Sequence, residues 1–167
     1  MRVILGLGSN RQFNGMSCVQ VLDEAVRKLS NFVSNLEVSS VYRSQAMYVT
    51  DQDDFYNMVV CGDYSGTCRQ LLDDIHSVES SLGRDRTREF RNGPRSLDVD
   101  IELFGNERIN DTDLVVPHER MTERAFVLKP LLEVLRKNAD KFKAEISFYE
   151  EKLSHLGNQR IDRIEKS

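Results

Sequence analysis

Two stretches of this chain carry apolar residues at intervals of three and four, and short β-branched runs stand on both sides of each stretch. They are residues 15–33 and residues 67–82. Such spacing gives a helix one apolar side, so both stretches are predicted to be helices that pack on a sheet. In the second, Thr67 and Gln70 form a capping box, and Gly83 is expected to end the helix.

Four further segments are predicted as strands from their β-branched or alternating residues, and they are 3–7, 36–42, 55–64 and 96–104. The resulting order is β-α-β-β-α-β, and two more helices are expected over 126–135 and 140–156. This order is typical of the α+β class with a ferredoxin-like core, a mainly antiparallel sheet and additional C-terminal helices. Pro130 is expected in the first turn of its helix or at a break, because proline disrupts helix interiors.

The bulk properties narrow the class of protein. At 167 residues, without an internal repeat or linker, the chain is expected to form one domain over residues 1–167. Its net charge of −4 argues against a nucleic-acid partner. The apolar run at the start is too short for a signal peptide or a membrane span. Three cysteines without CxxC spacing favour reduced thiols in a cytoplasmic protein. We expect a monomer that contacts no membrane.

The strand at residues 96–104 is the most informative segment for chemistry. Side chains along a strand point alternately to its two faces. We therefore expect one face to hold Leu97, Val99, Ile101 and Leu103, and the other to hold Asp98, Asp100 and Glu102. Neighbours on one face lie roughly 7 Å apart. Two carboxylates at that spacing can jointly hold Mg²⁺ ions, as in two-metal phosphotransferases. An ordinary solvent-facing strand is the alternative, but three like charges on one face repel each other.

The loop before this strand is rich in arginine. Residues 84–95 contain five arginines and have a local net charge of +3 in an otherwise acidic chain. Guanidinium groups bind phosphate oxygens through planar, paired donors. Arginines beside a metal-binding carboxylate pair match the needs of polyphosphate transfer, in which cations neutralise the charge that develops. The sequence therefore predicts a Mg²⁺-dependent phosphotransferase.

Glycines and a histidine add weaker signals. Gly6 and Gly8 follow the first strand and predict a pocket lined by backbone, although Arg11 stands where a dinucleotide fingerprint needs its third glycine. His118 follows a proline at an expected turn, and a lone histidine is more often structural than catalytic. His76 and His155 are assigned no role.

Together these segments resemble the hydroxymethyl-dihydropterin pyrophosphokinase family of folate biosynthesis. The matching pieces keep the family's order over roughly residues 1–135, and they are residues 6–10, 55–57, 82–86, 93–100, 116–118 and 124–128. The resemblance implies an ATP-dependent diphosphotransferase. Such an enzyme moves a pyrophosphoryl group from ATP to the hydroxymethyl oxygen of 6-hydroxymethyl-7,8-dihydropterin and releases AMP. ATP is then the co-substrate, and two Mg²⁺ ions are the cofactors.

The resemblance also implies residue roles by position. The catalytic residues would be Arg84, Arg95, Asp98 and Asp100, with the two aspartates as metal ligands and Arg95 stabilising the transition state. The ATP-binding residues would be Glu79, Arg84, Arg86, Arg91, Arg95, Ile101, His118 and Arg124. The pterin-binding residues would be Ser44, Gln45, Met47, Phe55, Asn57, Asn92 and Phe126. Within that set, Phe55 and Phe126 would sandwich the ring, and Asn57 would read its polar edge.

Three residues depart from the family pattern. Gln45 stands in place of a usual proline, Asn92 in place of a common aromatic residue, and Glu102 in place of an apolar one. We expect these departures to affect pterin affinity and loop closure rather than the class of reaction.

Two other functions remain as alternatives. One is a two-metal nucleotidyltransferase, which is disfavoured because its Gly-Ser turn precedes the acids closely, whereas Ser9 and Asp98 are far apart. The other is a catalytically altered, nucleotide-binding relative, and the intact Asp98, Asp100 and Arg95 argue against it.

Overall fold

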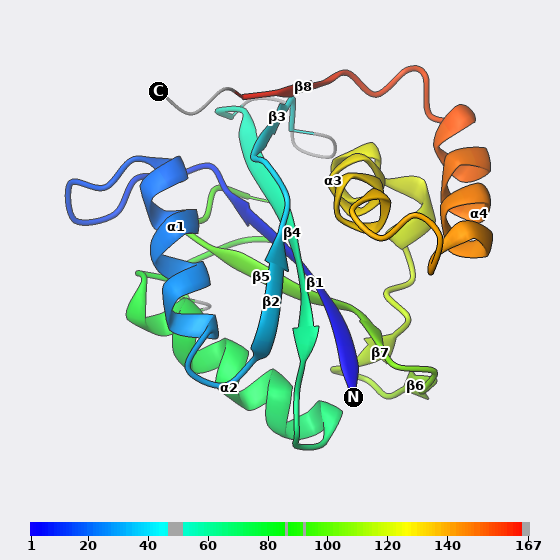
Figure 1. Cartoon of the computed structure of the whole chain (residues 1–167). Coiled ribbons are helices and arrows are strands. Elements are labelled where there is room, and N and C mark those ends of the chain that lie inside the picture. The colour runs from blue at the N-terminus through cyan, green and yellow to red at the C-terminus, as the bar shows by residue number, and fades with distance from the viewer. Residues whose placement is uncertain (47–51, 86, 92, 165–167) are drawn as a thin grey trace.

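The structure, a computed structural model, describes residues 1–46, 52–85, 87–91 and 93–164 (Figure 1). Its main elements are β1 (Arg2–Ser9), α1 (Cys18–Leu29), β2 (Ser34–Val38), β3 (Tyr42–Ser44), β4 (Phe55–Asp63), α2 (Cys68–Ser81), β5 (Asp98–Phe104), α3 (Ala125–Arg136), α4 (Lys143–Ser154) and β8 (Ile161–Arg163). A small hairpin of β6 (Ile109–Asn110) and β7 (Val115–Val116) follows β5, and a 3₁₀ turn, η1 (Met121–Glu123), precedes α3. Three predicted site residues, Met47, Arg86 and Asn92, lie outside the described residues.

The main sheet has β1 and β4 in its interior. Its strand order is β5-β1-β4-β3-β8, with β2 also paired to β4, and every pairing among the described strands is antiparallel. Because the two predicted β-α-β halves supply these strands in the predicted order, the α+β class and the ferredoxin-like core are confirmed.

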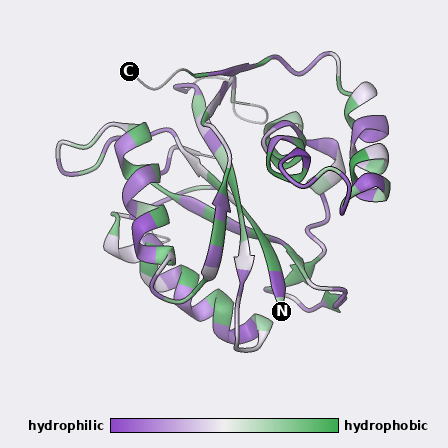
Figure 2. Cartoon of the chain, in the orientation of Figure 1, coloured by the Kyte–Doolittle hydropathy of each residue, from purple (hydrophilic) through white to green (hydrophobic). Residues whose placement is uncertain are grey.

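Helices cover both faces of the sheet (Figure 1). On one face, α1 and α2 pack on a core that includes Leu5, Leu22 and Leu71, each at most 1 % exposed. On the other face, α3 packs on β4, and α4 packs on α3. The helices carry hydrophilic and hydrophobic residues side by side, as expected of helices with one buried face (Figure 2). The capping box of Thr67 and Gln70 is confirmed at the start of α2.

Three details differ from the sequence prediction. The predicted strand 36–42 is two strands, β2 and β3. The segment between them holds one more residue than the facing part of β4, which interrupts the pairing. In that segment the Ser39 hydroxyl accepts the Val59 N–H. Pro130 lies in the second turn of α3, and the helix continues through it. Strand β8, at the sheet edge beside β3, was not predicted. None of the described helices is long and apolar enough to cross a membrane.

Candidate active site

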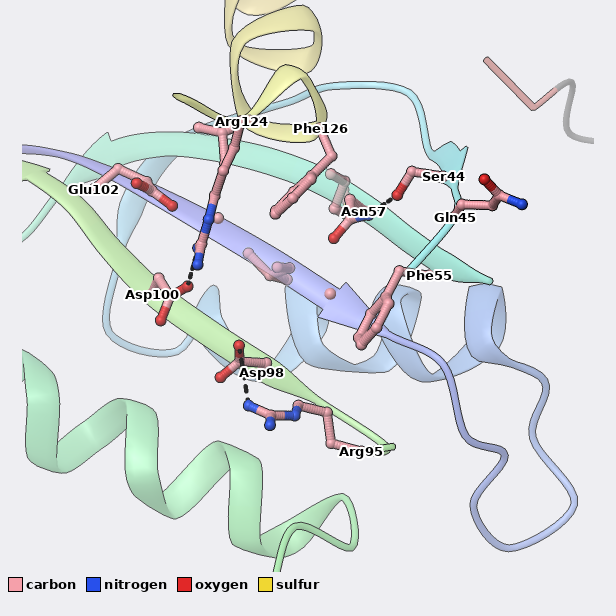
Figure 3. A pocket seen from close by; sticks show the side chains of 15 residues that line it. Ser44, Gln45, Phe55, Asn57, Arg95, Asp98, Asp100, Glu102, Arg124 and Phe126 are labelled. Carbon is pink, nitrogen blue, oxygen red and sulfur yellow. Dashed lines mark hydrogen bonds and ion pairs between the residues drawn. The ribbon is translucent and has the colours of Figure 1, made fainter. Parts of the chain in front are cut away.

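Strand β5 delivers the two predicted metal-binding carboxylates to the face of the sheet that α3 covers. Val99 and Ile101 point to the opposite face, where they join the α1–α2 core. Asp98 and Asp100 instead line a pocket with about 680 Å³ of empty space. Figure 3 shows both carboxylates on the same side of β5. The predicted shared face of Asp98 and Asp100 is thus confirmed.

Three arginines and a histidine lie beside these carboxylates. Oδ1 of Asp98 lies 2.9 Å from Nη1 of Arg84, and its Oδ2 lies 3.6 Å from Nη1 of Arg95. Oδ2 of Asp100 lies 3.7 Å from Nη1 of Arg124 and 3.8 Å from Nε2 of His118 (Figure 3 draws the contacts with Arg95 and Arg124). Each carboxylate therefore has two neighbouring basic side chains, of which only Arg95 is close to its partner in the sequence.

Burial and mutual repulsion set the charge of this group of side chains. Burial, together with the nearby Asp98 charge, raises the pKa of Asp100 to about 7. Burial and the Arg124 charge lower the pKa of His118 to about 4, so this imidazole is neutral near pH 7. Its Nδ1 accepts the Arg120 backbone N–H at 3.1 Å, which leaves the ring proton on Nε2, facing Asp100. A cation added here would relieve the repulsion between the two aspartates.

A second, more open cleft of about 1140 Å³ adjoins the first pocket. Six of the predicted ATP-binding residues line it, namely Arg84, Arg91, Arg95, Ile101, His118 and Arg124. His76, which was assigned no role, lines it as well, and so does Arg120. A histidine in the middle of a helical stripe gives no signal of its own. Asp98, Asp100, Arg95 and Arg124 line both cavities and so mark the place where the two meet.

Glu79 and Arg84 lie beneath the acidic strand. The Glu79 carboxylate is buried and accepts the Val99 backbone N–H at 2.9 Å. The Arg84 side chain is 7 % exposed and donates to the Leu97 carbonyl at 3.0 Å as well as to Asp98. Glu89 also forms a short ion pair with Arg84. These contacts fix the start of β5 and therefore the direction in which Asp98 points.

The predicted pterin-binding residues that the structure describes gather in the first pocket. Ser44, Gln45, Phe55, Asn57 and Phe126 all line it (Figure 3). The Asn57 amide donates to the Ser44 hydroxyl at 3.2 Å, which orients its Oδ1.

Two glycines of β1 open the floor of this pocket. Gly8 pairs with Asn57 on one side and with Asp98 on the other, and a Cβ at Gly8 would lie 2.8 Å from Asn57 Oδ1. A Cβ at Gly6 would lie 2.6 Å from Glu102 Oε1. The pocket lined by glycine backbone that the sequence predicted is thus confirmed, since both residues line it.

Glu102 lies deeper than the two aspartates, at an irregularity of the β1–β5 pairing. Ile4 pairs with Leu103 and Leu5 with Ile101, so Glu102 is the extra residue of a β-bulge. The bulge also turns Leu103 to the α3–α4 side, so its predicted place beside Val99 was wrong. Glu102 is 1 % exposed, and its Oε2 has no hydrogen-bond partner among the described residues. Burial and the Asp100 charge raise its pKa well above the usual range.

Replacing Glu102 by leucine is expected to stabilise the fold. A buried polar atom without a partner costs about 1–3 kcal/mol, and a leucine of similar volume removes that cost. Because its pKa is raised, the Glu102 carboxyl binds a proton more tightly in the folded state than in the unfolded state. The free energy of unfolding of the wild type should therefore fall as pH rises above the ordinary pKa of glutamate. Urea unfolding without metal should therefore show a larger gain for Glu102→Leu at pH 8 than at pH 5. A loss of stability at both pH values would mean that the carboxyl is paired.

The fold and the site define a class of protein, an α+β domain in which two carboxylates lie where an aromatic pocket, lined by Phe55 and Phe126, meets an arginine-rich cleft. The chain belongs to a family described as 7,8-dihydro-6-hydroxymethylpterin-pyrophosphokinase, whose model matches residues 4–136.

Individual relatives agree with that family. The 2-amino-4-hydroxy-6-hydroxymethyldihydropteridine pyrophosphokinase of Aquifex aeolicus is 36 % identical over 132 residues, which are 79 % of this chain and 79 % of that protein. The folic acid synthesis protein fol1 of Pneumocystis carinii is 40 % identical over 133 residues, 79 % of this chain. This chain spans only 17 % of that fungal protein's length, and 27 % and 36 % of two bifunctional relatives. A crystal structure of an HPPK-DHPS protein with substrates shares the fold at a TM-score of 0.61 and 12 % identity, covering 80 % of this chain and 41 % of that one.

Proposed function

We propose that this protein transfers a pyrophosphoryl group from ATP to the hydroxymethyl oxygen of 6-hydroxymethyl-7,8-dihydropterin, as a step of folate biosynthesis. The products are AMP and the pterin diphosphate. The observation that carries the proposal is the position of Asp98, Asp100, Arg95 and Arg124, which line both the aromatic pocket and the arginine-rich cleft. A group passing from a nucleotide in one cavity to an alcohol in the other would cross this point.

The pterin would occupy the first pocket. Phe55 and Phe126 offer aromatic faces to a flat ring, and Asn57, oriented by Ser44, offers an amide oxygen to its polar edge. Gln45 adds a second amide at the rim. The glycines of β1 keep the floor free of side chains, so the ring can lie close to the backbone.

The ATP phosphates would lie in the second cleft. Arg91, Arg95 and Arg124 line it and can donate paired hydrogen bonds to phosphate oxygens. His118 is neutral and presents an N–H, so it can donate to a phosphate oxygen without adding charge.

Asp98 and Asp100 fit the role of Mg²⁺ ligands. Among the described residues no group of three or more His, Cys, Asp or Glu side chains could hold a metal alone. That agrees with Mg²⁺ chemistry, since this ion is commonly bound by one or two carboxylates together with substrate phosphates. We propose two ions, which when bound would neutralise phosphate charge. A cation bound beside Asp100 would offset the burial and the Asp98 charge that raise its pKa, which supports this proposal.

In the proposed reaction, the hydroxymethyl oxygen forms a bond to the β-phosphorus of ATP. The bond between that phosphorus and the oxygen bridging to the α-phosphate breaks, and AMP leaves with the bonding electrons. The hydroxyl proton is released. Arg95, which touches Asp98 and lines both cavities, is placed to neutralise charge on the group in transit.

We also propose that residues 1–167 act as one pyrophosphokinase domain, as a monomer in the cytoplasm, without nucleic-acid or membrane partners. The three cysteines are free, and Cys61 and Cys68 are buried, which suits a reducing compartment.

The direct test of the proposed function is nucleotide product analysis with purified protein, ATP and Mg²⁺, with and without 6-hydroxymethyl-7,8-dihydropterin. We expect AMP to form only when the pterin is present, and to stop when the metal is chelated. ADP as the nucleotide product would contradict the proposal, and so would pyrophosphate release with a nucleotidylated pterin, the result expected of a nucleotidyltransferase.

A further inference from the structure

The C-terminal segment after α4 lies beyond residues 4–136, which the family model matches, yet it contacts the walls of the candidate pterin pocket. Strand β8 pairs with β3, so that Ile161 stands opposite Ser44. Ile161 is 6 % exposed and joins a small cluster with Tyr42 and Ala125, against which Phe126 packs. This segment therefore supports the pocket from behind, on the sides of both Ser44 and Phe126.

Gln159, just before β8, contacts the turn that carries Arg124. Its Oε1 accepts the Ala125 backbone N–H at 2.8 Å, and its Nε2 donates to the Glu123 carbonyl at 2.8 Å. One side-chain amide thus binds the residues on both sides of Arg124. Arg124 itself gives the first turn of α3 no side-chain cap, and Gln159 supplies from a distance an acceptor for one of the N–H groups that the start of a helix leaves unpaired.

The turn that Gln159 holds carries two side chains of the site. Arg124 has an extended backbone, and its Nη1 reaches to 3.7 Å from Asp100 Oδ2. Its guanidinium also lies over the Phe126 ring, 5.3 Å from the ring centre. Figure 3 shows Arg124 and Phe126 descending from the start of α3 toward the pocket. A rotation of the peptide groups next to Arg124 would move both side chains relative to β5.

We propose that Gln159 is a positioning residue, whose amide fixes the turn at residues 123–125 so that Arg124 faces Asp100 and Phe126 faces the pocket. In this role Gln159 touches no substrate and acts only through that turn. The inference deepens the proposed function, on which it rests.

The test compares Gln159→Ala with Thr67→Ala, which removes the local cap of α2, a helix on the other side of the sheet. Both variants lose a helix cap, so both should lower the thermal midpoint by about 2–4 °C. Only Gln159→Ala should lower kcat/KM for ATP, by about tenfold, because it alone displaces Arg124. Gln159→Glu keeps the acceptor for Ala125 but loses the donor to Glu123, so it should recover part of the rate. Equal rates in the two cap variants would overturn the inference.

A double-mutant cycle with Arg124→Ala identifies the route by which Gln159 acts. If Gln159 works through Arg124, its removal should change kcat/KM less than about twofold once Arg124 is already alanine. An undiminished tenfold loss in that background would contradict the inference.

Amide hydrogen exchange separates failure of this inference from failure of the proposed function. Gln159→Ala should speed exchange at the Ala125 N–H whether or not the protein turns over pterin. An unchanged exchange rate overturns the inference by itself. If the wild-type protein makes no pterin-dependent AMP, the proposed function is refuted. Faster exchange at Ala125 would then show that Gln159 orders this turn. The role of Gln159 in the reaction would be refuted together with the proposed function.

Discussion

Asp98→Asn and Asp100→Asn should each lower kcat by about 10³-fold without unfolding the protein. Asparagine keeps the shape of each side chain but removes the charge that would hold Mg²⁺ and the phosphates between the two cavities. The folded state should tolerate the change at Asp100, because burial and the Asp98 charge already oppose ionisation there, and the Asp98 side chain is 29 % exposed. Steady-state AMP formation and urea unfolding measure the two quantities.

Asp73→Asn is the matched control for these variants. Asp73 lies on α2, is exposed, and lines neither cavity, so the same change of charge should leave the rate unaltered. Near-normal turnover in either Asp98→Asn or Asp100→Asn would refute the metal assignment.

Arg95→Ala should lower kcat by about 10²- to 10³-fold, the cost of removing one preorganised group that stabilises charge in a transition state. The Arg95 side chain is only 13 % exposed and is braced by the Gly93 carbonyl, to which its Nε donates at 3.1 Å. Because it is held in this way, we expect the loss to appear mainly in kcat. Arg95→Lys should remain strongly impaired, since an ammonium group lacks the planar pair of donors.

Arg88→Ala provides the comparison within the same loop. The Arg88 side chain is 87 % exposed, contacts Asp85, and lines neither cavity. Its removal should leave kcat within about twofold, the small effect usual for exposed charges. If Arg88→Ala and Arg95→Ala were equally slow, the loop would act through its total charge and not through the position of Arg95.

Much of this fold follows from hydrophobic periodicity in the sequence. The stripes of α1 and α2 and the alternation of β5 are local patterns, and they placed Asp98 and Asp100 on one face correctly. The split between β2 and β3 could not be predicted in the same way, because it depends on how many residues of β4 face that segment. The bulge at Glu102 likewise depends on the partner strand, and it reversed the face of Leu103.

The candidate site shows the same limit. Resemblance to a family located the arginines and aromatic residues of both cavities, because they lie in compact motifs. It could not indicate Gln159, whose role depends on a contact across 34 positions of sequence with Ala125. Nor could it show that Glu102 has a buried carboxyl oxygen without a hydrogen-bond partner among the described residues, since that position depends on how β5 pairs with β1 beside Gly6.

In the proposed reaction, two phosphoryl groups move together from the arginine-rich cleft to an alcohol in the aromatic pocket. Turnover with ATP carrying ³²P at the β position tests it most directly. We expect the label to appear in the pterin product together with the γ-phosphate, and the AMP to be unlabelled. Label retained in ADP, with a singly phosphorylated pterin, would contradict it.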